Sequence, residues 1–369
     1  MQSLALGFLV SLLVTLAVVR YAHLHKRFSA DDDLRGVQKF HARPVPRIGG
    51  LGIVIGLLIS ATQLWFSYPQ VARSILLLAA CGTPAFLSGL IEDLTKRVSP
   101  LARLLATMLA ALLAYWVLDI RATRVDLPLL DPLLTYALAS LALTVLAVAG
   151  IANAVNIIDG FNGLAAMVSL MMFVSLAYVA FQVSDPVVLS ASLIMMGAVF
   201  GFFVWNFPAG LIFLGDGGAY FLGFMLGELS ILLVMRNAEV SAWYPVLMAM
   251  YPIFETCFSI YRKRFVRGMS PGIPDGVHLH MLIYKRLMRW AVGTREASVL
   301  TQRNSYTSPY LWMLCLIAVL PATLFWRHTG VLCFFVVVFA LTYVWLYVSI
   351  VRFRTPRWLV FRRARDAKH

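Results

Sequence analysis

The chain has 369 residues, of which 61% are hydrophobic and only 13% are charged, and its mean hydropathy is +0.82. Soluble domains carry about a quarter charged residues, so this composition excludes a soluble globular protein and indicates one that lies in a lipid bilayer. The net charge of +14 would suit a nucleic-acid ligand, but the basic residues follow the alternation of membrane loops instead.

Long apolar stretches recur throughout the chain. A spanning helix needs roughly 20 apolar residues, and the sequence predicts eleven spans, at about residues 3–19, 49–66, 75–91, 101–120, 133–152, 164–183, 187–205, 213–234, 244–261, 310–326 and 331–351. The first has no positively charged start and no small-residue cleavage site, so we interpret it as an anchor. With no linker or internal repeat between the spans, we expect an all-α, polytopic bundle that forms one domain over residues 1–369.

The basic residues indicate the orientation of this bundle. All but five of the 31 lysines and arginines fall in the loops after spans 1, 3 and 9 or in the C-terminal tail. The five exceptions are Arg73, Arg121, Arg124, Arg236 and Arg327. Cytoplasmic loops are enriched in Lys and Arg, so we expect a bacterial inner-membrane protein with a periplasmic N-terminus and a cytoplasmic C-terminus. The connections after spans 1, 3, 5, 7 and 9 are then cytoplasmic, and we call them loops 1, 3, 5, 7 and 9.

Loops 1 and 3 carry the first polar clusters. Loop 1 contains Lys39, His41 and Arg43 in a cationic segment that two prolines kink. Such a segment beside a membrane is commonly a topology signal or an anionic-lipid patch. Loop 3 places Glu92 and Asp93 side by side at a span end, where two carboxylates need a neutralising cation or a shared proton. The structural alternative for this pair is a solvated helix end that pairs with nearby basic residues.

Loop 5 is the richest segment. Asn153 and Asn156 are three residues apart and therefore share a helix face near its cytoplasmic end. Asp159 and Asn162 follow, each before a glycine, and these Asp-Gly and Asn-Gly pairs predict a tight turn. The structural alternative is a polar turn with an asparagine cap. Four amide or carboxylate side chains between two fully apolar spans instead favour a ligand site.

Loops 7 and 9 add a glycine-rich segment and two histidines. Phe213 precedes Gly-Asp-Gly-Gly, in which Asp216 is the one carboxylate. Glycines let the backbone approach a ligand and turn its amides toward phosphate, and one carboxylate suits Mg²⁺, which takes its other ligands from substrate phosphates. In loop 9, His278 and His280 are spaced poorly for a shared metal on a helix, and they follow a run of basic residues.

All five clusters fall on the same predicted face of the membrane. A rigid bundle with chemically rich loops on one face is typical of an active site at the membrane surface. A transporter would place ionisable groups near the bilayer midplane in two matching halves. Here no repeat is found, and Glu228 and Glu255 are the only acidic residues that lie away from the ends of predicted spans.

The ordered set of loops, from Lys39 to His280, resembles the polyprenyl-phosphate N-acetylhexosamine-1-phosphate transferases (glycosyltransferase family 4). The resemblance implies that Glu92 and Asp93 take the place of an Asp-Asp pair. It also aligns Asn153, Asn156, Asp159 and Asn162 with the nucleotide-associated signature of the family. It implies a uracil-stacking role for Phe213, an Mg²⁺ ligand in Asp216, and phosphate and sugar recognition by Lys39, His41, Arg43, His278 and His280.

Three departures from the family pattern bear on specificity. Glu92 replaces the first aspartate of the pair and moves its charge by one methylene. Asn162 replaces a second aspartate, so it can bind but cannot act as a base. The loop-9 sequence is His-Leu-His, not the three consecutive histidines of the muramoyl-pentapeptide enzymes. The resemblance therefore favours priming of O-antigen, capsule or another envelope polysaccharide over peptidoglycan synthesis.

The expected reaction transfers a sugar-1-phosphate from a UDP-sugar to undecaprenyl phosphate with release of UMP. We expect Asp93, Glu92 and Asp159 to be catalytic, Mg²⁺ (or Mn²⁺) as cofactor, and a homodimer as a further state. Phospho-MurNAc-pentapeptide transfer and a lipid or sugar transporter remain alternatives. A CDP-alcohol phosphotransferase is a third, but its Asp-Gly motif continues Ala-Arg, whereas this chain continues Phe161-Asn162. A non-enzymatic scaffold would leave the five loop clusters unexplained.

Overall fold

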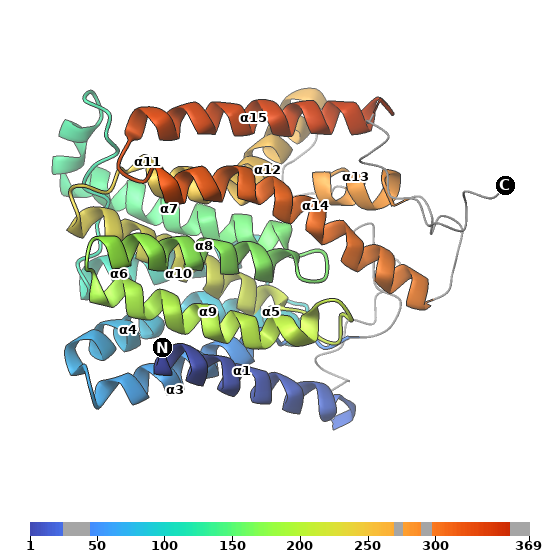
Figure 1. Ribbon diagram of the computed structural model, residues 1–369, viewed down its shortest axis with the longest axis horizontal. Coiled ribbons are helices and arrows are strands. Elements are labelled where there is room, and N and C mark those ends of the chain that lie inside the picture. The colour runs from blue at the N-terminus through green and yellow to red at the C-terminus, as the bar shows by residue number, and fades with distance from the viewer. Residues whose placement is uncertain (25–44, 269–275, 289–296, 355–369) are drawn as a thin grey trace.

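The computed structural model describes residues 1–24, 45–268, 276–288 and 297–354 (Figure 1). Within these ranges the chain is helical and contains no β-strand. The elements are α1 (Gln2–Arg20), α3 (Gly50–Trp65), α4 (Pro69–Cys81), α5 (Thr83–Thr95), α6 (Pro100–Val117), η1 (Asp131–Thr135), α7 (Ala137–Ile158), α8 (Leu164–Gln182), α9 (Pro186–Asn206), α10 (Gly215–Arg236), α11 (Trp243–Met248), α12 (Met250–Tyr261), η2 (Arg262–Val266), α13 (Leu279–Arg286), α14 (Ala297–Leu324) and α15 (Thr329–Val351). The predicted all-α class is confirmed for this part of the chain.

Eight of the described helices are long and apolar enough to cross a membrane, and a bent pair raises this number to nine. The eight are α1, α6, α7, α8, α9, α10, α14 and α15, and the bent pair is α4 with α5. All eleven predicted ranges fall on helices, but 49–66 is the short α3 and 244–261 is divided into α11 and α12. The protein is thus a polytopic helical bundle, while the number eleven and the orientation of the termini stay predictions.

The two broken spans have a common physical cause. Proline has no backbone N–H and cannot complete the helical hydrogen bond to the residue four positions earlier. Pro84 lies in the first turn of α5, where the axis bends by 45° relative to α4. Pro252 lies in the first turn of α12, directly after the interruption at Ala249. Apolar composition alone shows neither break.

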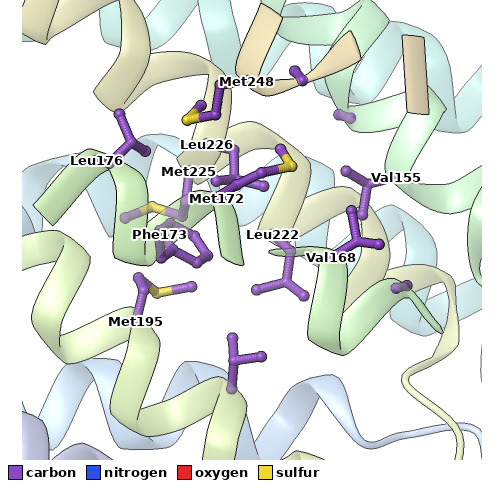
Figure 2. Close-up of a cluster of buried hydrophobic side chains, with 14 of the residues drawn as sticks. Val155, Val168, Met172, Phe173, Leu176, Met195, Leu222, Met225, Leu226 and Met248 are labelled. Carbon is purple, nitrogen blue, oxygen red and sulfur yellow. The ribbon is translucent and has the colours of Figure 1, made fainter. Parts of the chain in front are cut away.

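The centre of the bundle is α10, which is buried along almost its whole length. It packs most extensively against α7 and α5. Figure 2 shows its middle turn, Leu222, Met225 and Leu226, meeting Met172 and Phe173 of α8 in a cluster of buried apolar side chains. This packing fixes where the first turn of α10 lies.

The helices run side by side, and several polar segments gather at one end of the bundle (Figure 1). The loops that precede α8 and α10 lie at this end, together with α13. Helix α14 starts at Ala297, well before the predicted 310–326, and its added turns carry buried polar side chains. Hydropathy detects only the apolar part of such a helix, so the extension was not predicted.

Candidate active site

The first turn of α10 is the structural basis of the site. Gly215 opens this helix and Asp216 follows in its first turn. The amides of Asp216 and Gly217 donate to Oδ1 and Oδ2 of Asp93, each over 3.0 Å, and the Gly215 amide donates to the carboxylate of Asp159. A helix N-terminus has unpaired N–H groups and a partial positive charge. Asp93 and Asp159 therefore act together as the N-terminal cap of α10.

This capping corrects one expectation from the sequence. The amides of the glycine-rich segment were expected to face a phosphate, but Asp93 and Asp159 already accept three of them. Asp93 is 1% exposed and both of its oxygens are used. The glycines serve close packing instead of anion binding by their amides.

Two glycines show why the segment requires this composition. Gly215 has φ of +77°, and a Cβ there would overlap the carbonyl oxygen of Arg47 and the carboxylate of Asp93. Gly89 of α5 lies against the backbone of Asp216 and Gly217, where a Cβ would also collide. Only glycine avoids both the steric clash and the cost of positive φ. These positions let α5 and residues 45–50 approach the first turn of α10.

The chain before α3 is held against the segment before α10. Phe213 donates its amide to Pro46 over 2.8 Å and accepts at its carbonyl from Gly49 over 3.0 Å. This pairing brings Arg47 to the carboxylates, with Nε 3.7 Å from Oδ1 of Asp93 and Nη2 3.4 Å from Oδ1 of Asp216. The half-buried Phe213 is thus adjacent to the cluster, and its expected role as a ring against the nucleotide stays a prediction.

Asp216 is the carboxylate with the most varied partners. Besides Arg47, its Oδ1 accepts from Nδ2 of Asn156 on the last turn of α7, over 3.0 Å. Its Oδ2 forms an ion pair with Arg103, in the first turn of α6. The structure therefore unites three predicted residues, Asp93, Asn156 and Asp216, and adds two arginines that were not assigned to the site.

Arg103 is the main residue that sequence reasoning missed, because it was counted only as a topology signal. Ser99 caps α6 by accepting from the Ala102 amide over 3.2 Å, which places Arg103 in the first helical turn. A cation at a helix N-terminus is opposed by the helix dipole, so it requires a carboxylate nearby. An arginine in the first turn of a predicted helix is therefore a sequence signal for a nearby carboxylate. Arg103 also lies 5.9 Å from the ring centroid of Tyr220.

Asp159 completes the carboxylate cluster at the end of α7. Burial raises the pKa of its carboxyl to about 7, although Arg47 and the Gly215 amide act in the opposite direction. Asp93, Asp159 and Asp216 thus share two guanidinium groups and the positive end of α10. A carboxyl that titrates near neutral pH is suited to exchange a proton during a reaction.

Asn162 lies apart from this cluster, at the junction of loop 5 with α14. Its amide N–H donates to Oδ1 of Asn304 over 2.8 Å, and its side chain donates to Ser305 over 3.1 Å. Its carbonyl accepts from Ser308 over 2.6 Å. With 4% exposure, Asn162 fastens the turn to the unpredicted polar face of α14. Its expected nucleotide contact stays a prediction.

Glu92 and Asn153 also lie outside the carboxylate cluster. Glu92 accepts from the Val98 amide over 2.7 Å and so closes the turn after α5. Asn153 lines an apolar groove between α6, α7, α10 and α12. The catalytic role of Glu92 stays a prediction, and so do the roles of Lys39, His41 and Arg43, which lie outside the described residues.

The loop-9 histidines lie on α13, beside loop 5. The rings of His278 and His280 are stacked with 5.2 Å between centroids, and His280 meets Phe161 edge-on at 5.5 Å. His280 is 1% exposed, and burial lowers its pKa to about 3, so it is neutral at pH 7. A neutral His280 offers hydrogen bonds and no charge, and its role in phosphate or sugar recognition stays a prediction.

The donor set around Asp216 fits a hard divalent cation. Among the described residues no group of three or more His, Cys, Asp or Glu side chains forms a metal cage. Mg²⁺, however, commonly takes one or two carboxylates and fills its remaining positions with water and substrate phosphates. Asn156 uses its Nδ2 on Asp216, which leaves its amide oxygen for a ligand. Asp216 already binds cationic groups on both oxygens.

An apolar groove of about 660 Å³ lies between α6, α7, α10 and α12. Its wall includes Leu104 and Asn153, close in sequence to Arg103 and Asn156 of the charged cluster. From there it follows α7 and α10 to Arg121 and Arg124 at the far end. Gly150 lies on this wall with no atom within 4 Å of where a Cβ would be. The groove has the apolar lining expected for a hydrocarbon chain.

Comparison with known proteins places the chain in a family. Residues 75–234 match glycosyl transferase family 4. The decaprenyl-phosphate N-acetylglucosaminephosphotransferase of Mycolicibacterium smegmatis is 30% identical over 74% of this chain and 70% of its own. The "Probable undecaprenyl-phosphate N-acetylglucosaminyl 1-phosphate transferase" of Bacillus subtilis is 26% identical over 80% of each chain. Together these matches confirm the resemblance found in the sequence: the chain belongs to glycosyl transferase family 4, which includes the polyprenyl-phosphate N-acetylglucosamine-1-phosphate transferases.

Proposed function

We propose that the protein transfers an N-acetylhexosamine-1-phosphate from a UDP-sugar to undecaprenyl phosphate and releases UMP. The observation that carries this proposal is the charged cluster around Asp216, in which arginines meet buried carboxylates, in a bundle that also contains an apolar groove lined by Leu104 and Asn153. A phosphate on a polyprenyl chain needs both environments at once. The names of the relatives, which pair polyprenyl phosphates with N-acetylglucosamine phosphate transfer, support the same reaction.

In this reaction an oxygen of the lipid phosphate attacks the sugar-linked phosphorus of the UDP-sugar. The bond from that phosphorus to the bridging oxygen breaks, and UMP leaves with the electron pair. Both reactants are anions, so the site must reduce their repulsion and hold them in line. Arg47 and Arg103 carry the guanidinium groups for this task, since each already pairs with a carboxylate that a phosphate oxygen can replace.

Asp216 and Asn156 would hold Mg²⁺ in this proposal. When bound, the cation would neutralise charge on the diphosphate and on the departing UMP. Asp93 positions Asp216 by capping the turn that carries it. Asp159 is one of the carboxyls suited to hold a proton near neutral pH, because burial raises its pKa to about 7. Phe213, beside Arg47, is assigned to the uracil ring.

The membrane topology, the polysaccharide pathway and the oligomeric state are proposed from the sequence. The 31 lysines and arginines are divided unequally between alternate loops, which supports eleven spans in a bacterial inner membrane with the site facing the cytoplasm. The His278–Leu279–His280 segment favours an O-antigen, capsule or other envelope polysaccharide over peptidoglycan. We further propose one domain per chain and a homodimer.

The deciding experiment measures UMP release by the purified protein from UDP-sugars in the presence of polyprenyl phosphate and Mg²⁺. UDP-N-acetylhexosamines or their 6-deoxy relatives are expected to react. Asp216→Asn keeps the size of the side chain and removes its charge, and should lower turnover by roughly 10²–10⁴-fold. Partial rescue at higher Mg²⁺ would indicate weakened metal binding. Turnover of UDP-MurNAc-pentapeptide alone would refute the donor assignment, and a folded Asp216→Asn protein within about threefold of wild type would remove Asp216 from the mechanism.

A further inference from the structure

Two glutamates lie within the predicted spans, and they have opposite surroundings. Both Glu228 of α10 and Glu255 of α12 are 0% exposed. Neither oxygen of Glu228 has a hydrogen-bond partner in the described part of the chain. Glu255, in contrast, accepts hydrogen bonds from three groups, at the start of α13 and on α15. A buried carboxylate is costly unless it is paired and hydrogen-bonded, so the partners of Glu255 indicate a selected arrangement.

The first partner of Glu255 is a histidine of the site. Its Oε1 lies 2.8 Å from Nδ1 of His278 and also accepts from the Leu279 amide over 3.3 Å. Its Oε2 accepts from the hydroxyl of Tyr343 on α15 over 2.7 Å. A carboxylate can only accept, so Nδ1 of His278 must carry the hydrogen. Nε2 of His278 is then the ring nitrogen left for a ligand, and it has no hydrogen-bond partner among the described residues.

The contacts continue from His278 toward loop 5. The His278 ring lies nearly parallel to that of His280, with an interplanar angle of 4°. His280 in turn meets Phe161 and lies next to Gly160, which follows Asp159. The orientation of His278 is therefore linked to the turn that carries Asp159. A change at Glu255 can reach the site through this stack without any contact between Glu255 and a substrate.

The charged and titratable groups around this contact come from four helical elements and from loop 5. They are Tyr251 and Arg262 from α12 and η2, His280 from α13, Tyr343 and Tyr347 from α15, and Asp159 beyond His280. Arg262 donates to the hydroxyl of Tyr347 over 3.2 Å. Of these groups only Asp159 is another carboxylic acid, and it lies on the far side of His280. Glu255 is thus the carboxylate that acts directly on His278.

We infer that Glu255 is a positioning residue that holds the Nδ1–H of His278 and thereby presents Nε2 of His278 to the phosphates of the substrate. This inference rests on the proposed function and on the phosphate recognition that the family resemblance implies for His278. A carboxylate behind a histidine fixes its tautomer and ring orientation, and it stabilises the doubly protonated ring. That protonated ring donates from Nε2 to an anionic oxygen. A neutral amide at position 255 cannot stabilise the charge.

The test compares four proteins: wild type, Glu255→Gln, Glu255→Asp and the control Glu228→Gln. The control makes the same chemical change at an equally buried glutamate that contacts no histidine. Nitrogen-15 NMR of labelled histidines reports which ring nitrogen of His278 carries the hydrogen. The pH profile of kcat/KM for UMP release reports the consequence for the reaction, and thermal unfolding in detergent is measured in parallel.

In wild type we expect the hydrogen on Nδ1 of His278. Glu255→Gln should give a mixture of tautomers, lower kcat/KM by about 10–100-fold, and move the basic limb of the profile down by about one to three pH units. Glu255→Asp keeps the charge and should restore the position of that limb. Glu228→Gln should leave the His278 signals and the profile unchanged.

Some results would overturn the inference while the proposed function stands. These are a wild-type His278 with its hydrogen on Nε2 alone, or a Glu255→Gln protein whose activity falls by one factor at every pH. The second result would show that Glu255 only supports the packing of α12, α13 and α15. Absence of UMP release from the wild type would refute the proposed function instead, while the NMR measurement would still decide the contact between Glu255 and His278.

Discussion

Asp93 has two candidate roles that a substitution can distinguish. The sequence predicts a catalytic group, whereas the structure shows a helix cap. Both of its oxygens accept amides of α10, from Asp216 and Gly217, at 3.0 Å. Asp93→Asn keeps one acceptor oxygen and turns an NH₂ group toward the other amide. Asp93→Ala removes both acceptors. If capping is the role, the two variants should differ in stability in proportion to the amides they leave unpaired.

The expected magnitudes follow from these contacts. An unpaired buried donor costs about 1–3 kcal/mol, so Asp93→Asn should lower the free energy of unfolding by about that amount. Asp93→Ala should cost about twice as much, since two amides lose their partner. Displacement of Asp216 should reduce UMP release by about 10–100-fold in Asp93→Asn, as for other residues that orient a metal ligand.

The assay measures UMP release and unfolding of both variants in detergent across a range of Mg²⁺ concentrations. If Asp93 only caps α10, raised Mg²⁺ should recover part of the activity of Asp93→Asn, because the charge of Asp216 remains. An Asp93→Asn protein as stable as wild type, with activity lost by about 10⁴-fold and no response to Mg²⁺, would refute the capping account. It would support proton transfer by Asp93 instead.

Three other residues provide independent tests. Gly150→Leu should fill open space in the groove and raise KM for polyprenyl phosphate about tenfold, which corresponds to the loss of two buried CH₂ groups of the lipid, while KM for the UDP-sugar stays unchanged. The control Gly330→Leu, also in open space, should change neither KM value. Equal effects of the two substitutions would refute the groove assignment. Arg103→Ala should lower kcat/KM for the UDP-sugar by about 10–100-fold. Arg103→Lys should lower it by less, because lysine keeps the positive charge but lacks the two-pronged guanidinium group. Wild-type kinetics in Arg103→Ala would exclude Arg103 from the site. Burial lowers the pKa of His280 to about 3, so its contribution to stability is complete above its unfolded pKa of about 6.5 and is lost as pH falls toward 3. The melting temperature in detergent should thus fall less between pH 6.5 and 4 in His280→Gln than in wild type, and parallel curves would contradict this burial.

The sequence predicts the helical class well and places the polar clusters of the candidate site between apolar runs, because both depend on composition and local pattern. Long apolar runs identify α7 and α10 within a few residues, and polar groups between such runs are conspicuous. The bends at Pro84 and Ala249 change direction within an apolar run, and hydropathy does not register direction. The polar start of α14 is equally invisible, because its buried partners come from loop 5.

The sequence also shows which residues are present without showing how they pair. Arg103 reads as one more cytoplasmic cation until α6 and α10 are brought together. Asn162 reads as a nucleotide ligand, yet its hydrogen bonds go to α14 and to the chain before α10. Both outcomes depend on contacts between residues far apart in the sequence, 46 positions for Asn162 with Pro208 and 142 for Asn162 with Asn304. Local spacing carries no information on such distances.

The arrangement around α10 explains why three aspartates can lie so close together. Like charges at short range normally force one carboxyl to keep a proton, and burial does raise the pKa of Asp159. The positive end of α10 and the guanidinium groups of Arg47 and Arg103 offset the remaining repulsion. A substrate diphosphate that attracts these arginines would leave Asp216 with less compensation, and its affinity for a divalent cation would rise. Metal and nucleotide sugar should therefore bind cooperatively, each lowering the charge that opposes the other.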